Sequence, residues 1–477
     1  MRADRAPTEP AGGWRAGLYV AVVCATVASF FAQEQLAYLL IAAPAMLPVV
    51  IWWRSGQRGI PVLPFISLLY FLYYAVPLFG DNIASYSSSE LIAAAASVGG
   101  FLIAASVAFW LFQPTRTQYG THGRQLISDE DAPRIVFVGL AGGILFQILL
   151  AANGLGWLGS WFGAVRQVAL SLTSVACYLL GYARASGVLV GQRWVLALGA
   201  LLLLICLAMS GLFLVGGIMI CLAAFLGYVV AAKRLPWVAL APLLLVFTIL
   251  HAGKAEMRQS YWLEGGNWIE GSYLFQIPDM MSEWLEDGVV ALSSGDAGQD
   301  LVQRASLLNM VLFVQRATPD VVPHLGGETY TLLPEMLVPR FFDSNKTASQ
   351  AAMTLLNIHY GLQTAEDAKG TAIGWGLVAE GYANLGAVGV IAIGGVFGLL
   401  CGVFTRWSIG APAVSTPMFA SIAATMALLN VEQDFPYLMV TLAQTVVAVL
   451  IAGVFLGTLR RRAPAAAPAE SMAAPEL

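Results

Sequence analysis

The sequence is poor in charge. Only 11% of its 477 residues are Asp, Glu, Lys or Arg, whereas a soluble globular protein carries about 25%. Hydrophobic residues make up 58%, and the mean hydropathy is +0.74. A water-facing surface needs more charge than this, so the composition excludes a soluble globule and indicates that lipid is the solvent. The net charge of −4 provides no basic surface for nucleic acid.

Cysteine is also scarce, and its positions exclude a disulfide framework. All five cysteines lie in long apolar stretches: Cys24, Cys177, Cys206, Cys221 and Cys401. The hydrophilic stretch 252–372 has none, so no disulfide holds it if it faces an oxidising compartment. No Cys/His spacing indicates a metal site, and we expect no metal and no other cofactor.

Long apolar runs recur along the chain at the length that a bilayer core of about 30 Å requires. We predict an all-α polytopic membrane protein of about twelve transmembrane helices. The predicted spans are 14–33, 36–53, 60–79, 91–112, 134–152, 166–183, 194–210, 212–231, 235–251, 386–405, 413–430 and 437–458. No clean cleavage site follows the first run, which favours a retained helix over a signal peptide.

The short connections between the predicted spans differ in charge. The basic connections contain Arg54 and Arg58, Arg116 and Arg124, Arg184 and Arg193, Lys233 and Arg234, Arg406, and Arg460–Arg462. All of them fall on one side if both termini are cytoplasmic, as the positive-inside rule requires. Arg166 is the one exception. The chain is therefore predicted to cross its membrane many times, with both termini cytoplasmic.

These boundaries divide the chain into five regions. We predict a cytoplasmic N-terminus (1–13), a nine-helix membrane region (14–251), an extracytoplasmic helical loop domain (252–372), a three-helix membrane region (373–459) and a disordered cytoplasmic tail (460–477). Two segments of the loop domain, 272–288 and 300–317, have helical apolar spacing and are predicted to lie on the membrane surface.

The cations of this acidic, aromatic-rich loop are candidate anion ligands. They are Lys254, Arg258, Arg304, Arg316, Arg340, Lys346 and Lys369. Lys254 and Arg258 share one helical face, and Arg340 lies between apolar residues. One interpretation is that each side chain reaches to lipid headgroups or forms an ion pair with an acidic residue at the protein surface. The other is a site for a lipid-borne phosphate, which Arg and Lys bind by charge-assisted hydrogen bonds.

Glu380 is a carboxylate at the start of the tenth predicted span. Asn384 and Gly376 lie four residues to either side, so the three share one helical face. A carboxylate at membrane depth needs a partner or a polar cavity. Glu380 is therefore either paired to an arginine that holds the loop against the bundle, or a general base for a substrate hydroxyl.

Weaker candidates lie nearby in the sequence. His324 and Glu328 flank a glycine turn, and His359 precedes an aromatic residue; such histidines are more often ordinary surface residues than bases. Glu432 and Asp434, in a short turn between spans, are interpreted either as helix caps or as neighbours of the site.

Two sequence blocks resemble a known family. RATPDVVPHLGGETYTLLPEMLVPRFFDSNK, from Arg316, and GWGLVAEGYANLGAVGV, from Gly374, resemble the Wzy-type polymerases of bacterial O-antigen and exopolysaccharide repeat units. The matching residues are Arg316, Gly327, Glu328, Thr329, Tyr330, Pro339, Arg340, Lys346, Glu380, Tyr382, Asn384 and Gly386. The sequence departs from the family at Thr347, where proline is usual, and in FFDSN, which lacks the usual tryptophan. The blocks cover about 70 residues.

The resemblance implies a GT-C-like fold and a metal-independent glycosyltransferase. Its substrates would be polyprenyl-diphosphate-linked oligosaccharides, and its further partners membrane lipids, a chain-length regulator and a flippase. It implies catalytic roles for Glu380, Arg340 and Arg316. The implied substrate-binding residues are Lys254, Arg258, Arg304, His324, Tyr330, Lys346, Tyr382 and Asn384.

Three other functions remain open on the sequence. An O-antigen ligase or another lipid-linked glycan transferase would share the topology. A transporter or flippase would show repeat-related halves and short loops, which this sequence lacks. A non-catalytic subunit of a secretion complex is the third alternative.

Overall fold

The computed structural model describes residues 23–56, 58–80, 83–112, 125–126, 131–233, 236–264, 273–294, 306–338, 347–370 and 373–462. The regular elements among these residues are helices, with one isolated β-bridge between Gln125 and Ser415. Arg304, Arg340 and Lys346 lie outside them, as do 1–22 and 463–477.

Ten described helices are long and apolar enough to cross a membrane, so the chain is a multi-pass membrane protein. Nine of them carry the labels α2 (Gln35–Arg54), α4 (Ser88–Leu111), α5 (Ala132–Ala151), α6 (Phe162–Ala185), α7 (Gly191–Met209), α8 (Leu214–Ala232), α9 (Trp237–Arg258), α17 (Gly376–Ser408) and α19 (Phe435–Arg462). The tenth runs from Val62 to Phe79 and comprises α3 (Val62–Tyr70), a π-helical turn η1 (Phe71–Ala75) and a 3-10 turn η2 (Val76–Phe79).

Ten of the twelve predicted spans thus correspond to long apolar helices. Of the first prediction, 14–33, residues 14–22 lie outside the described residues, and 23–29 are helical. The eleventh, 413–430, is the shorter helix α18 (Thr416–Leu428), in which every residue from Met418 onward is buried. Thirteen residues extend about 20 Å, less than the thickness of a bilayer core. α18 is apolar because it is enclosed by other helices, which a hydropathy pattern does not distinguish from contact with lipid.

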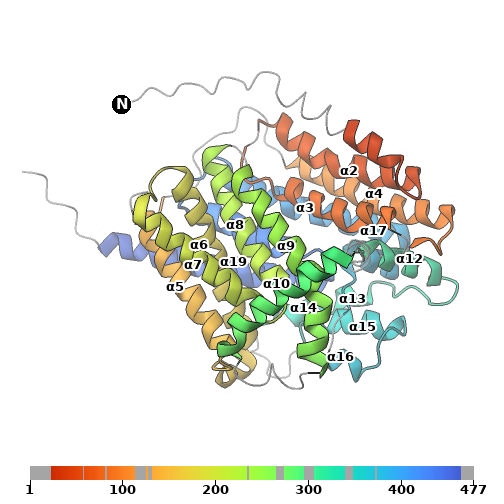
Figure 1. The fold of residues 1–477 in the computed structure, drawn as a ribbon. Coiled ribbons are helices and arrows are strands. Elements are labelled where there is room, and N and C mark those ends of the chain that lie inside the picture. Colours follow the sequence, from red (N-terminus) through yellow and green to blue (C-terminus); the bar gives the residue numbers. More distant parts are fainter. Residues whose placement is uncertain are drawn as a thin grey trace, which may run out of the picture.

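The helices form two groups (Figure 1). In one, α17 packs along α4, and α4 packs on α2. In the other, α6 lies between α5 and α8, and α7 contacts α5 and α8. α18 and α19 connect the groups, because α18 contacts α17 and α6, and α19 contacts α18 and α6.

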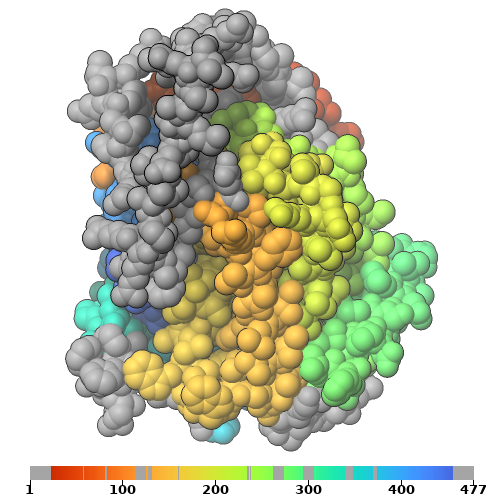
Figure 2. Space-filling view, turned by 90° about the vertical axis from the view of Figure 1, so that its left-hand side faces the viewer, coloured from red at the N-terminus to blue at the C-terminus, as the bar shows by residue number. Residues whose placement is uncertain are grey.

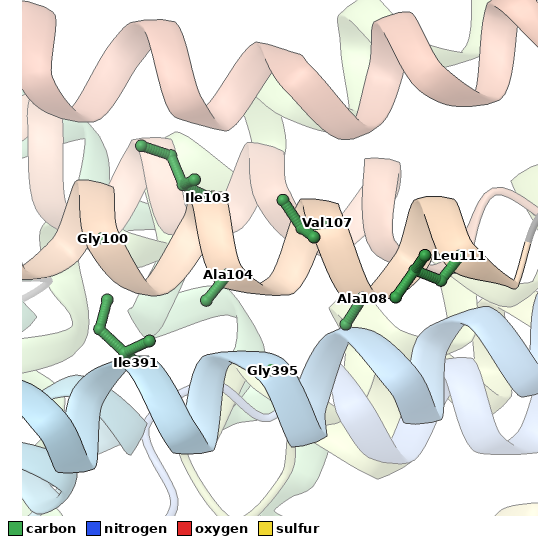
Figure 3. Close-up of a pocket in the computed structure, with 8 residues that line it drawn as sticks. All are labelled: Gly100, Ile103, Ala104, Val107, Ala108, Leu111, Ile391 and Gly395. Carbon is green, nitrogen blue, oxygen red and sulfur yellow. The ribbon is translucent and has the colours of Figure 1, made fainter.

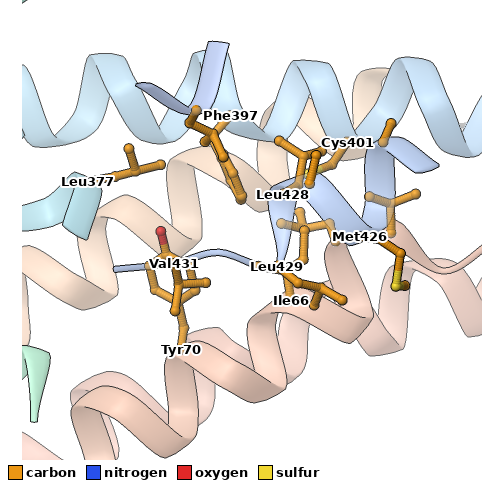
Figure 4. Close-up of a cluster of buried hydrophobic side chains, with 14 of the residues drawn as sticks. Ile66, Tyr70, Leu377, Phe397, Cys401, Met426, Leu428, Leu429 and Val431 are labelled. Atoms are coloured by element: carbon orange, nitrogen blue, oxygen red, sulfur yellow. The ribbon is translucent and has the colours of Figure 1, made fainter. Parts of the chain in front are cut away.

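A core of aromatic and aliphatic side chains fills the space between α3, α4, α17 and the end of α18 (Figure 4). The ring of Tyr70 stacks on that of Phe101, with centroids 5.0 Å apart, and the ring of Phe397 tilts against both. Leu377, Leu428 and Val431 complete this cluster in the view. The core therefore fixes the start of α17, where the candidate site lies, against the first group of helices.

Small residues let α4 and α17 approach closely. A Cβ added at Gly398 would lie 2.0 Å from the carbonyl oxygen of Ala105, and one at Gly394 would lie 2.6 Å from that of Phe101. Such close backbone contact is typical of membrane helix pairs. Beside this contact runs an open apolar groove of about 600 Å³ (Figure 3), lined by Gly100, Ile103, Ala104, Val107, Ala108, Leu111, Ile391 and Gly395.

Between α9 and α17 the chain forms short helices. They are η6 (Gln259–Glu264), η7 (Leu274–Gln276), α10 (Ile277–Ser294), α12 (Leu307–Ala317), α13 (Glu328–Thr331), α14 (Leu333–Leu337), α15 (Ala351–His359) and α16 (Asp367–Gly370).

The two amphipathic segments predicted to lie on the membrane surface each pack against protein on one side. α12 buries Leu308, Val311 and Val314, and it contacts α4 and α17. α10 crosses α9, where the buried Trp284 donates from Nε1 to the carbonyl oxygen of Leu250 at 2.6 Å. Figure 2 shows α10, in green, beside the face that α5 and α7 form. α12 thus buries its apolar face against protein. The segment 272–288 also leaves Phe275 and Leu285 exposed, and its predicted place on the membrane surface stays a prediction.

Candidate functional site

The candidate site begins with a break in α17. Leu385 and Gly386 have non-helical backbone angles, and Gly386 has φ 60° and ψ −148°, a conformation that glycine adopts readily. A Cβ added at Gly389 would lie 2.1 Å from the carbonyl oxygen of Gly381, so residues 376–384 fold back against the rest of α17. We call 376–384 the entry segment. Its C-terminal carbonyl groups need hydrogen-bond donors.

The turn 324–327 supplies these donors. His324 Nδ1 lies 3.1 Å from the carbonyl oxygen of Tyr382. The amides of Leu325 and Gly326 donate to the carbonyl oxygens of Ala383 and Asn384, each at 3.0 Å. Three consecutive carbonyl groups at the end of the entry segment are thus capped by three consecutive residues of a turn about 60 positions earlier.

Side chains reinforce this contact. Thr329, the second residue of α13, donates its hydroxyl hydrogen to Glu380 Oε1 at 2.9 Å. Asn384 Nδ2 donates to Thr329 Oγ1 and to the carbonyl oxygen of Glu380, both at 2.9 Å. Thr329, Glu380 and Asn384 are all completely buried. The prediction that Glu380 and Asn384 share one helical face is confirmed.

Glu380 also binds the start of α19. The amide of Phe435, the first residue of that helix, donates to Glu380 Oε2 at 2.6 Å. A helix N-terminus carries partial positive charge, which stabilises a carboxylate there. Asp434 caps the same helix, since its Oδ1 accepts from the amide of Tyr437 at 2.8 Å. The interpretation of Asp434 as a helix cap is therefore confirmed, and the residue lies next to the amide that binds Glu380.

Three polar atoms of this cluster are buried without a hydrogen-bond partner in the described part of the chain. They are Asp434 Oδ2, Asn384 Oδ1 and the hydroxyl oxygen of Tyr330. Buried polar groups are almost always hydrogen-bonded, so this concentration is unusual. Burial raises the pKa of Asp434 to about 6. Burial, together with the nearby Glu380 carboxylate, raises the pKa of Tyr330 well above its ordinary value.

Five of the predicted site residues therefore gather here: His324, Tyr330, Glu380, Tyr382 and Asn384. Their exposure differs. Glu380 and Asn384 are buried, whereas His324 is exposed, with its ring centroid 6.0 Å from that of Tyr382. His359, at the end of α15, supports the turn through Nε2, 2.9 Å from the carbonyl oxygen of Pro323.

Arg316 has partners of its own. It contacts Glu90, at the start of α4, through two nitrogens at 2.7 and 3.1 Å, and its guanidinium lies 4.0 Å from the ring centroid of Tyr86. Glu90 is also the capping-box residue of α4, bonded to Ser87. Arg316 thus fastens the end of α12 to the start of α4. Its predicted catalytic role stays a prediction.

Arg258 and Lys254 lie on the last turns of α9, as predicted. Arg258 Nη2 donates to the carbonyl oxygen of Leu212 at 3.1 Å, and its guanidinium lies 5.2 Å from the ring centroid of Phe213. These contacts hold the turn between α7 and α8. A role in phosphate binding is untested for both residues, as it is for Arg304, Arg340 and Lys346.

Sequence reasoning gave too little weight to Thr329. It appeared only as one letter of a motif, although its hydroxyl joins Glu380 to Asn384. Asp434 was predicted to be a helix cap or a neighbour of the site, without a named partner. No local pattern reveals either contact, because Thr329 is about 50 residues from Glu380, and Asp434 follows a further helix. Glu380 itself pairs with a hydroxyl and an amide among the described residues, and not with the arginine that one interpretation required.

Within the described residues, no group of three or more His, Cys, Asp or Glu side chains is arranged to hold a metal ion. Comparisons with known proteins gave no match, whether to family models, to curated sequences or to solved structures.

Proposed function

We propose that this chain is a polymerase that joins polyprenyl-diphosphate-linked oligosaccharide repeat units into an O-antigen or exopolysaccharide. In this proposal it works on the outer face of the bacterial inner membrane, with both termini in the cytoplasm. The membrane location of the chain suits a lipid-linked substrate.

The observation that carries the proposal is the contact between the two blocks that resemble such polymerases. His324, Leu325, Gly326 and Thr329 belong to the first block, and all four bond residues 380–384 of the second. Nothing in the resemblance itself requires the blocks to touch, because 27 residues, 347–373, lie between them. If the two blocks form one reaction site, they must lie in direct contact, and these hydrogen bonds provide that contact.

The geometry divides the roles between two residues. Glu380 is completely buried, and both of its carboxylate oxygens already accept hydrogen bonds. It is therefore proposed as a positioning residue, which holds the 324–329 turn on the entry segment. His324 is exposed, and donation from Nδ1 to the Tyr382 carbonyl group would leave Nε2 as the basic nitrogen. His324 is thus proposed as the general base.

The proposed reaction is one glycosyl transfer. A hydroxyl oxygen of one lipid-linked repeat unit attacks the anomeric carbon of the second glycan, and His324 Nε2 takes the hydroxyl proton. The bond from the anomeric carbon to the diphosphate oxygen breaks, and polyprenyl diphosphate leaves with the bonding electrons. Cations would stabilise the leaving diphosphate. Arg340 and Lys346 are proposed for that role, since Arg316 is already neutralised by Glu90.

Polymer length in cells that carry single variants tests this assignment. His324→Gln removes the base and is expected to shorten the polymer to one or a few repeat units, with normal protein abundance. Glu380→Gln keeps an oxygen for one donor only, and it is expected to lower both abundance and polymer length. His359→Gln is the matched control, because the half-buried His359 also bonds a backbone carbonyl group through one ring nitrogen.

Long polymer in the His324→Gln strain would remove His324 from the reaction, and long polymer in both strains would remove the whole site. The product distinguishes the nearest alternative. A ligase would leave the length of the lipid-linked glycan unchanged and would transfer it to another acceptor.

A further inference from the structure

Glu380 and Asp434 bring two carboxyl groups into one buried cluster. Both residues are completely buried, and neither forms an ion pair among the described residues. Two ionised carboxylates in a dry site repel each other and lack the water that would stabilise them. Within the described part of the chain, something other than a cation therefore compensates one of the two charges.

The hydrogen bonds show where a proton is missing. Glu380 accepts from Thr329 and Phe435, one bond on each oxygen, as an ionised carboxylate does. Asp434 accepts one bond, on Oδ1, and its Oδ2 has no partner. Asn384 Oδ1 is a second buried acceptor without a donor. A carboxylate and an amide oxygen cannot satisfy each other, because both only accept.

We propose that Glu380 and Asp434 form a proton-binding site that holds one shared proton, placed on Asp434 Oδ2. The proton turns one unpaired acceptor into a donor, which Asn384 Oδ1 or the Tyr330 hydroxyl group can accept. It also reduces the charge of the pair to a single negative charge, on the carboxylate that two donors and a helix N-terminus already stabilise.

The groups that face the pair come from every element packed around it. α13 contributes Tyr330, and α17 contributes Glu380 with Asn384. α19 contributes the backbone amides of Phe435 and Tyr437. Glu335, on α14, is exposed and accepts a hydrogen bond from Thr347. The amide of Phe435 stabilises the charge on Glu380, whereas the amide of Tyr437 opposes a proton on Asp434, so burial is what favours retention of the proton.

Loss of this proton would loosen the site. With both carboxylates ionised, repulsion would separate α17 from the start of α19. Thr329 would then lose its hydrogen bonds with Glu380 and Asn384. The contact between α17 and the start of α19 is thus stable at low pH and weakened at high pH. This inference goes beyond the proposed reaction and does not depend on it.

The sign of the pH effect follows from the direction of the shift. Burial raises the pKa of Asp434 above its unfolded value, so the folded state binds the proton more tightly than the unfolded chain does. The contribution to stability is complete below about pH 4 and is lost as the pH rises through the raised pKa of Asp434. Thermal unfolding of the full chain in lipid nanodiscs should therefore occur at lower temperature at pH 7.5 than at pH 5.

Asp434→Asn is the decisive variant, because asparagine keeps the shape of a protonated carboxyl group and its ability to donate. We expect this variant to unfold at the same temperature at pH 5 and pH 7.5. Asp320→Asn is the control, since Asp320 is exposed, and it should retain the pH dependence of the wild type. The proposal would be overturned if the unfolding temperature changed equally with pH in the wild type and in Asp434→Asn. It would also be overturned if Asp434→Asn failed to fold at any pH.

Infrared difference spectra between pH 5 and pH 8 give a second readout that involves no polymer. The wild type should show the C=O band of a buried protonated carboxyl group at low pH, and Asp434→Asn should abolish or displace it. A band that Asp434→Asn and Glu380→Gln both leave unchanged would contradict a shared proton. An inactive enzyme that still shows the band would reject the proposed reaction alone.

Discussion

Replacing Thr329 by valine should separate hydrogen bonding from packing at the centre of the site. Valine has the shape of threonine but no hydroxyl group. The variant would leave Glu380 Oε1 without its donor and would leave one Asn384 N–H group unpaired, both in a completely buried place. A lost hydrogen bond to a buried charge costs roughly 1.5–3 kcal/mol, and an unsatisfied neutral group about 1 kcal/mol or more.

We therefore expect Thr329→Val to destabilise the fold by about 3 kcal/mol. Thr329→Ser is the matched control, because serine keeps the hydroxyl group and loses one methyl group, at a cost of about 1 kcal/mol. The expected order of stability is wild type, then serine, then valine. Packing alone would predict the opposite order for the two variants, since valine fills the site and serine leaves a cavity.

The half-life of the folded protein in nanodiscs at one elevated temperature provides the assay, because large membrane proteins often unfold irreversibly. A difference of about 2 kcal/mol between the valine and serine variants corresponds to a roughly 30-fold difference in unfolding rate. This holds if the hydrogen bonds of residue 329 are already lost in the transition state for unfolding. Valine as long-lived as wild type, with serine shorter-lived, would refute the hydrogen-bonded junction.

Three further predictions concern the bundle and its cations. Gly398→Leu should destabilise the fold strongly, because its Cβ would overlap the Ala105 carbonyl group. Gly395→Leu is the control, because its side chain meets open space, and it should unfold like the wild type. Equal unfolding temperatures for the two variants would contradict the close contact of α4 and α17. Arg316→Gln should change stability and polymer length only as much as Glu90→Gln does, and a larger loss of polymer in Arg316→Gln alone would restore its catalytic role. Trp284→Phe should cost about 1 kcal/mol through loss of one hydrogen bond, and protease resistance of α10 measures it.

The membrane-spanning part of the fold could be predicted from the sequence because each span is a local property. Apolar length alone located α5 and α8 to within a few residues. The same property failed at α18, because a short apolar helix enclosed by protein has the hydropathy of one that faces lipid. α12 shows the related limit: its apolar face was recognised, but the helices that cover it are far away in the sequence.

The candidate site was only partly predictable. Glu380 stood out because a carboxylate is rare beside a long apolar run, and Asn384 followed from helical spacing. The partners of Glu380 did not follow, because Thr329 and Phe435 reach it only after the entry segment has folded back at Gly386. The prediction of Glu380 as the base assumed access to substrate, and burial, which no single sequence reveals, favours a positioning role.

The most direct test of the proposed function uses the purified chain in lipid vesicles with polyprenyl-diphosphate-linked repeat units as the only glycan. The account predicts lipid-linked products of two and more repeat units, one polyprenyl diphosphate released for each bond formed, and loss of both in His324→Gln but not in His359→Gln. Intact starting material with the wild-type chain, or equal turnover in the two histidine variants, would contradict it.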